Sequence, residues 1–236
     1  MSGIPFRRHR VPLAALLLVM TASATIATSA TLDTLTSKDA ASGLRAALSQ
    51  GVDVAVAQLG AQGGFLNDPK VAIPLPPALQ KADRALRMFG MGKDADDLKA
   101  AMNHAAEAAV AQAKPVFKQA LQHMSVADAK AILTGGDDAG TQYFRKATSG
   151  PLTAKFKPMV AQETAKLELA SLYGKYAGKA ADLHLMSAED ANLNDYVTAK
   201  ALDGLFSRIA DEERAIRKDP LGQASSLIKK VFGAVR

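Results

Sequence analysis

Cysteine and tryptophan are absent from this chain of 236 residues, and aromatic residues make up only 5% of it. Without cysteine no disulfide can brace the fold, so the burial of apolar side chains has to stabilise it. The isolated histidines His104, His123 and His184 have no cysteine with which to complete a zinc site. Nor can a cysteine carry a lipid, so we expect a soluble protein without a stable membrane anchor.

Catalytic and nucleotide-binding motifs are also lacking. The chain has no Gly-x-Ser-x-Gly motif and no phosphate-binding loop pattern. Gly90 and Gly92 resemble part of a dinucleotide fingerprint, but they follow a predicted helix instead of a strand. His104 and Glu107 are three residues apart, yet a dicarboxylate metal bundle needs Glu-x-x-His motifs, and the chain contains none. We therefore predict no catalytic residue, no metal site and no cofactor.

The N-terminal residues have the layout of a secretory signal peptide. Arg7, Arg8 and Arg10 precede about ten apolar residues, and a run of small residues follows at 21–30. The apolar run is shorter than the about 20 residues that span a bilayer. We expect cleavage near residue 24 or 30, which makes 1–30 the signal peptide and leaves a periplasmic or secreted domain at 31–236. The paired arginines leave open whether export follows the general or the twin-arginine route.

The formal charge of +6 belongs in part to this leader. Removing its three arginines leaves 26 basic against 23 acidic residues, because no acidic residue precedes Asp33. A net charge of +3, with basic and acidic residues interspersed along the chain, predicts no concentrated basic face. We therefore do not expect nucleic-acid binding.

The rest of the sequence has a helical pattern. Strong helix formers are abundant, apolar residues recur at steps of three and four, and strict alternation over the length of a strand is almost absent. Caps, glycines and prolines divide this pattern into about eight to ten helices with short joins. We predict an all-α fold, with a single irregular multi-helix domain. The expected helices lie near 37–59, 77–89, 94–114, 115–124, 125–134, 137–148, 151–176, 193–218 and 225–232.

Residues 60–77 form the longest stretch without a helical pattern. Four prolines and three glycines exclude a helix there, and Pro74 and Pro76 exclude a central strand. The apolar side chains of this stretch would be poor linker material, so we predict a long Pro/Gly-rich loop packed onto the domain, with a short extended piece near 71–75. These side chains are Phe65, Leu66, Val71, Ile73 and Leu75.

A candidate binding site lies at the expected start of the helix near 137. Gly135 and Gly136 free the backbone, and two carboxylates then stand where the helix dipole favours negative charge. Tyr143 belongs to the other face of this helix. One hypothesis is a polar binding lip, and the alternative is a capped amphipathic helix with an exposed face. The lip would consist of Asp137, Asp138, Gln142 and Arg145.

Asp203 is a second candidate, because its helical neighbours are mostly apolar. They are Tyr196, Ala199, Phe206 and Ala210. We expect Asp203 to be partly buried or at the margin of the core, held by an arginine, a lysine or a backbone donor. Further along the same helix, residues 211–218 indicate a solvated face with pairs such as Glu213 and Arg217.

The C-terminal tip combines apolar residues with Lys229 and Lys230. This composition is compatible with binding to a membrane surface. The alternative is that its apolar side chains dock onto the core. They are Leu227, Ile228, Val231 and Phe232.

Several runs of the chain together resemble a bacterial family, domain of unknown function family 4197. The resemblance extends over residues 35–234, nearly the whole chain after the leader. It implies an exported helical protein of a Gram-negative bacterium, and it implies no activity, substrate or catalytic residue. The runs lie at 64–67, 73–76, 133–139, 141–145, 195–198, 200–206 and 226–233.

These observations favour a non-enzymatic periplasmic binding or interaction protein with an unknown partner. An apolar small molecule in a pocket lined by Phe65 and Ile73, or an envelope protein on an apolar patch, are the candidate partners. The first alternative is an enzyme of unrecognised type with an acidic site near Asp137, Asp138 and Asp203. The second alternative is a membrane-surface protein that uses the C-terminal tip.

Overall fold

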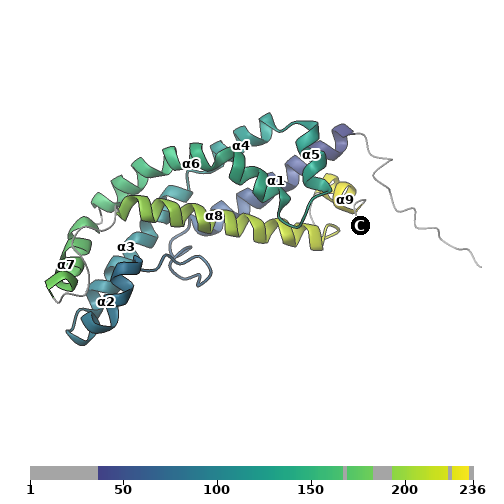
Figure 1. Ribbon diagram of the computed structural model, residues 1–236. Helices are drawn as coiled ribbons and strands as arrows, with labels where there is room; N and C mark the ends of the chain where they lie inside the picture. The colour runs from purple at the N-terminus through teal and green to yellow at the C-terminus, as the bar shows by residue number, and fades with distance from the viewer. Residues whose placement is uncertain (1–36, 167–168, 183–192, 223–224, 234–236) are drawn as a thin grey trace, which may run out of the picture.

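Every regular element that the structure describes is an α-helix (Figure 1). The computed structural model describes residues 37–166, 169–182, 193–222 and 225–233, so the expected signal peptide at 1–30 lies outside the described residues. Nine helices occur within these ranges, which confirms the all-α prediction. They are α1 (Ser37–Leu59), α2 (Pro77–Met88), α3 (Gly92–Val110), α4 (Lys114–His123), α5 (Val126–Leu133), α6 (Ala139–Lys166), α7 (Leu169–Asp182), α8 (Leu193–Lys218) and α9 (Ser226–Gly233).

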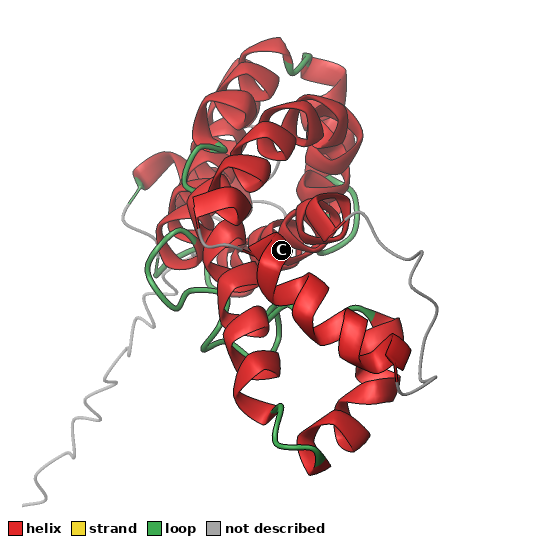
Figure 2. Ribbon diagram, turned by 90° about the vertical axis from the view of Figure 1, so that its left-hand side faces the viewer, coloured by secondary structure: helices red, strands yellow, loops and turns green. Residues whose placement is uncertain are grey.

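The two longest helices, α6 and α8, lie side by side along the molecule. α3 packs against both of them, and α1 packs against α8 together with α4, α5 and α9. In Figure 1, α2, α3 and α7 form one end of the molecule and α5 and α9 form the other. Figure 2 shows the same helices in red and the described loops between them in green. One hydrophobic core runs through all of these contacts.

α1 has the apolar stripe that the sequence predicted. Steps of three and four bring its apolar residues onto one helical face. All five members of the predicted stripe are buried, at 4% exposure or less, which confirms this element. They are Leu44, Leu48, Val52, Val56 and Leu59.

The loop between α1 and α2 packs onto the domain, as predicted, and a carboxylate from α3 holds its backbone. Phe65 is completely buried. Glu107, itself only 5% exposed, accepts hydrogen bonds from the amides of Gly63, Phe65 and Leu66 at 3.1–3.3 Å. Because Gly63 has a φ of +78°, the turn needs a residue without a β-carbon at this point.

The predicted extended piece of this loop has no strand partner within the described residues. Instead, the side chain of Asn103 pairs with both backbone groups of Ile73. Its oxygen accepts from the Ile73 amide at 2.8 Å, and its nitrogen donates to the Ile73 carbonyl at 2.9 Å. A buried backbone group without a partner would be costly, so Asn103 supplies the bonds that a neighbouring strand would otherwise provide.

The prediction of separate helices at 137–148 and 151–176 is wrong. α6 runs from Ala139 to Lys166 through Pro151 and Pro158. A proline in a helix interior costs about 3 kcal/mol. Each large apolar side chain that the helix buries contributes about 1.5–3 kcal/mol, so a continuous buried stripe outweighs the two prolines. This stripe, at steps of four, is Phe144, Thr148, Leu152, Phe156, Val160 and Thr164.

The C-terminal helix α9 docks onto the core. Ile228, Val231 and Phe232 are buried, whereas Leu227 remains 40% exposed. The guanidinium of Arg217 lies 5.5 Å from the centre of the Phe232 ring. The apolar side chains on which the C-terminal membrane hypothesis depended are therefore mostly occupied within the protein.

No helix in the described part of the chain is both long and apolar enough to span a bilayer.

Candidate functional site

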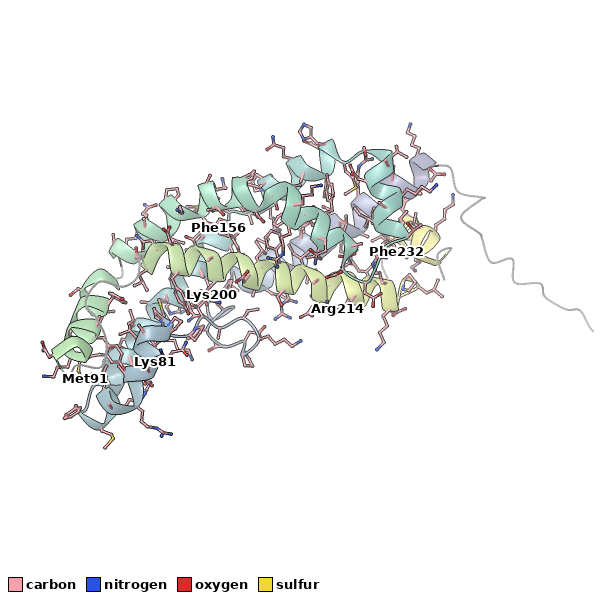
Figure 3. All side chains as sticks on the ribbon, in the orientation of Figure 1. Lys81, Met91, Phe156, Lys200, Arg214 and Phe232 are labelled. Atoms are coloured by element: carbon pink, nitrogen blue, oxygen red, sulfur yellow. The ribbon has the colours of Figure 1, made fainter. Side chains whose placement is uncertain are left out.

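A polar stripe on α6 forms one wall of an open groove. Since α6 is continuous, residues four apart along it lie on the same face. Four such residues line the groove, and they are Arg145, Ser149, Thr153 and Lys157. In Figure 3, Phe156 marks α6 and Lys200 marks α8, the two helices that bound it.

The opposite wall belongs to α8. We call the whole depression the α6/α8 groove, and its volume is about 330 Å³. This size falls at the lower end of the range for small-molecule sites, which is about 300–1,000 Å³. The lining residues from α8 are Asp195, Thr198, Ala199, Leu202, Asp203 and Phe206.

An ion pair joins the two walls at each end of the groove. Arg145 lies 3.6 Å from Asp203, and Lys157 lies 2.9 Å from Asp195. The Arg145 guanidinium also lies over the ring of Phe206, 4.6 Å from its centre. All four charged side chains are about half exposed, and exposed pairs contribute only about 0–1 kcal/mol each. These charges therefore remain available to a ligand.

Hydroxyl groups lie between the two ion pairs. Ser149 donates to the carbonyl of Arg145 at 2.6 Å, and Thr153 donates to the carbonyl of Ser149 at 2.8 Å. Each of these hydroxyl oxygens keeps its capacity to accept a hydrogen bond.

Thr198 differs from the other buried threonines. Within the described residues, Thr141, Thr148 and Thr164 each donate a hydrogen bond, whereas the Thr198 hydroxyl has no partner at an exposure of 2%. A buried polar group without a partner costs about 1–3 kcal/mol. Thr198 also lines the α6/α8 groove, so a ligand bound there is a candidate for the missing partner.

Arg145 and Asp203 are the two sequence-predicted site residues that the structure places in the groove. Asp203 is 61% exposed. Of the two expected positions, partial burial is therefore wrong, and the margin of the core remains, because Asp203 lines the groove together with the buried Phe206. The expected basic partner is present, since Arg145 lies 3.6 Å from Asp203 and Lys200 lies 4.0 Å from it. Burial among apolar neighbours was expected to remove water from the Asp203 carboxylate. The carboxylate keeps its water, because this face of α8 opens to the groove.

The other predicted residues lie elsewhere. Asp138 accepts a hydrogen bond from Gln142 at 3.0 Å on the exposed side of α6, and Asp137 is exposed. The Tyr143 hydroxyl donates to the carbonyl of Ala120 on α4 at 2.9 Å, and burial raises the pKa of this phenol. Seven residues separate Asp138 from the groove residue at 145, which corresponds to about 10 Å along the helix.

Glu213 is an important residue whose role the sequence did not reveal. The prediction of a solvated face at 211–218 is wrong for this side chain, which is 4% exposed. Its carboxylate accepts from the amides of Gly140 and Thr141 at 2.9 and 2.8 Å, and from the Thr141 hydroxyl at 2.9 Å. The expected pair with Arg217 is present at 2.8 Å.

The Glu213 carboxylate therefore occupies the N-terminal end of α6. The first amides of a helix attract an anion because they lack partners within the helix. Here a carboxylate from α8 already meets two of them. Of the four residues of the predicted polar lip, only Arg145 lines the α6/α8 groove, and the lip stays a prediction beside the alternative of a capped amphipathic helix.

His104 and Glu107 form a close pair with a structural role. Their side chains are 2.9 Å apart, and Glu107 also binds the backbone of the loop at 63–66. Within the described residues, no cluster of three or more potential metal-binding side chains occurs.

One sequence signal could have revealed the α6/α8 groove. Polar residues recur at every fourth position from Arg145 to Lys157. The predicted break near Pro151 divided this series between two helices, so its common face was not recognised.

Comparison with known proteins yields one match. The model of a family described as a protein of unknown function, DUF4197, matches residues 34–233, in agreement with the resemblance noted in the sequence. No curated protein and no solved structure matches the chain.

Gly140→Ala tests the close approach at the start of α6. A β-carbon there would lie 2.5 Å from Leu48 Cδ2 and 3.1 Å from Glu213 Oε1. We expect the free energy of unfolding to fall by about 1–3 kcal/mol, because the neighbours must move apart. Urea unfolding followed by circular dichroism measures this change.

Gly174→Ala in α7 is the matched control. No described atom lies within 4 Å of its added β-carbon, so the substitution should be neutral or stabilise by up to about 1 kcal/mol. Equal effects of the two substitutions would contradict the packing of α6 against Glu213.

Thr198→Val tests the unpartnered hydroxyl. Valine has nearly the same shape and removes a polar group that costs about 1–3 kcal/mol, so the unfolding free energy should rise by about 1 kcal/mol. Thr148→Val is the control, because the Thr148 hydroxyl donates to the carbonyl of Phe144 at 2.7 Å and its loss should bring no gain. A lower stability of Thr198→Val, measured by urea unfolding, would show that this hydroxyl is satisfied.

Proposed function

We propose that this chain, which belongs to the DUF4197 family of proteins of unknown function, is a non-enzymatic binding protein of the bacterial periplasm whose α6/α8 groove holds a short peptide with charged ends. One observation carries the proposal: the groove has an ion pair at each end and hydroxyl groups between them. The unpartnered Thr198 hydroxyl supports it independently.

The spacing of the charges suits a short extended chain. Arg145 and Lys157 are twelve residues apart on α6, or about 18 Å along the axis, and Asp195 and Asp203 are about 12 Å apart on α8. An extended peptide of about five residues covers a similar distance. Its free amino group would meet an aspartate at one end of the groove, and its carboxylate would meet Arg145 or Lys157 at the other.

The groups between the ion pairs suit a peptide backbone. Peptide amides can donate to the oxygens of Ser149 and Thr153, and a peptide carbonyl can accept from the Thr198 hydroxyl. These polar groups favour a peptide over the purely apolar small molecule considered from the sequence, and the apolar side chains of Ala199, Leu202 and Phe206 complete the lining. Phe65 and Ile73, which were expected to line an apolar pocket, are 0% and 1% exposed and belong to the core.

An acidic catalytic site receives less support. Asp137 and Asp138 lie about 10 Å from the groove along α6, as the helical rise requires. Asp195 and Asp203 lie in the groove but are about 12 Å apart along α8. Paired catalytic carboxylates, as in glycoside hydrolases, are about 5–9.5 Å apart.

The periplasmic location is a prediction from the leader sequence. The arginines at 7, 8 and 10, the apolar run and the small residues before 30 motivate it. Cell fractionation with N-terminal sequencing should recover a chain that begins shortly after residue 24 or 30 from the periplasm. Recovery of only the full-length chain, and only from the cytosol, would contradict this part of the proposal.

The peptide proposal is tested with pools of tetrapeptides and pentapeptides that have free ends. Binding is measured by calorimetry and by chemical-shift changes on α6 and α8. We expect binding that weakens about tenfold or more when the same pools are acetylated and amidated, because each lost charge removes a charge-assisted hydrogen bond. Arg145→Gln combined with Lys157→Gln should cause a similar loss.

Lys118→Gln combined with Lys130→Gln is the matched control, because both lysines are exposed and lie on α4 and α5, outside the groove. It should bind like the unmodified protein. Equal binding of free and blocked peptides, or equal losses in the two double variants, would overturn the assignment of the groove.

A further inference from the structure

The turn between α2 and α3 exposes two neighbouring large apolar side chains. Met88 is 84% exposed and Phe89 is 63% exposed. The other large apolar residues that are exposed in the described part of the chain are single. They are Val126, Leu221 and Leu227. A contiguous apolar feature at the end of a molecule indicates a contact surface more strongly than scattered single residues do.

The backbone of this turn is fixed by hydrogen bonds. The amide of Phe89 donates to Ala85 at 3.3 Å, and the amide of Met91 donates to Leu86 at 3.1 Å. Gly90 has a φ of +80°, the left-handed conformation that commonly ends a helix. Met91 packs partly against the core. Met88 and Phe89 therefore project from a turn whose backbone is held by hydrogen bonds.

Basic residues accompany the apolar pair on α2. Lys81, Arg84 and Met88 follow one another at steps of three and four, so they share one helical face. All three are exposed, and neither Lys81 nor Arg84 forms an ion pair with a described residue. Figure 3 labels Lys81 and Met91 at this end of the molecule, with α2, α3 and α7.

Each acidic residue near the turn already has a basic partner. Arg87 lies 2.9 Å from Asp83 and 2.7 Å from Asp96. Two further pairs, one within α3 and one between α3 and α7, engage the remaining carboxylates in the first two turns of α3. They are Lys93 with Asp97, at 2.5 Å, and Lys175 with Asp94, at 2.7 Å. These pairs join three cations to four carboxylates, so together with Lys81 and Arg84 the net charge around Met88 and Phe89 is +1.

We infer that this tip, formed by Lys81, Arg84, Met88 and Phe89, binds reversibly to an anionic lipid surface. Met88 and Phe89 enter the interface between headgroups and acyl chains, while Lys81 and Arg84 lie above the lipid phosphates. The inference does not depend on the peptide proposal, because the tip and the α6/α8 groove share no residue.

A lipid surface fits this tip better than a protein does. A stable protein interface buries about 800 Å² on each partner, and two side chains on a projecting turn offer far less. Lipids can surround a projection from all sides, and the unpaired cations match their charge. Because the tip offers only two apolar and two basic side chains, the strength should resemble that of a single acyl chain, about 10⁴ M⁻¹, which gives reversible attachment.

Single-tryptophan variants provide a direct test, because the chain has no tryptophan of its own. Phe89→Trp should show a blue shift of its emission with vesicles of phosphatidylcholine and phosphatidylglycerol at low salt, and quenching by lipids brominated in the acyl chain. Leu221→Trp, at a single exposed apolar residue, should show neither. Absence of both signals from Phe89→Trp would overturn the inference.

Vesicle co-sedimentation of the unlabelled protein separates the apolar and electrostatic contributions. Met88→Ser combined with Phe89→Ser should lower binding by roughly 30-fold or more. Lys81→Gln combined with Arg84→Gln should lower it by about 30-fold, a loss that added salt reproduces in the unmodified protein. All these side chains are exposed, so the urea midpoint should not change.

Val126→Ser combined with Leu221→Ser is the matched control and should bind vesicles like the unmodified protein. Unchanged binding in the Met88 and Phe89 variant would overturn the inference. Self-association of the unmodified protein would also overturn the inference, if sedimentation shows that it rises with concentration and that the Met88 and Phe89 variant abolishes it. The tip would then be a contact between protein copies.

Discussion

The buried carboxylate of Glu213 fixes the relation between the two central helices. It reaches from α8 to the first amides of α6 and bonds Gly140 and Thr141, while Arg217 balances its charge. A buried carboxylate without such partners would be strongly destabilising. These bonds hold the start of α6 at this place against α8, which sets the register in which their side chains meet further along.

The same physical device recurs at the loop between α1 and α2. A buried helix side chain there replaces regular backbone pairing. The Glu107 carboxylate accepts hydrogen bonds from three backbone amides of the loop, and the Asn103 side chain forms hydrogen bonds with both the amide and the carbonyl of Ile73. A loop with four prolines cannot form its own ladder of hydrogen bonds, so α3 supplies the partners. Two of the sequence runs that resemble the family lie close to these buried carboxylates. Run 64–67 contains amides that bind Glu107, and run 133–139 directly precedes Gly140, whose amide binds Glu213.

Two surface features, the α6/α8 groove and the tip at Met88 and Phe89, contribute little to the stability of the fold and favour a role in binding. The α6/α8 groove has ion pairs that add little stability and a hydroxyl that has no partner among the described residues. The tip at Met88 and Phe89 exposes apolar area beside unpaired cations. The two lie in different parts of the molecule, so a protein held at a lipid surface by the tip could still present its groove to a ligand.

The sequence by itself determined the helical class, most helix positions, the packed loop and the stripe of α1, because these follow from local spacing and turn chemistry. Only the tertiary structure decided that α6 continues through Pro151, since the compensating burial comes from other helices. It also decided that Glu213 is buried while Asp203, ten residues earlier on the same helix, is exposed. Helical spacing says which residues share a face, and only the neighbouring elements decide whether that face meets protein or water.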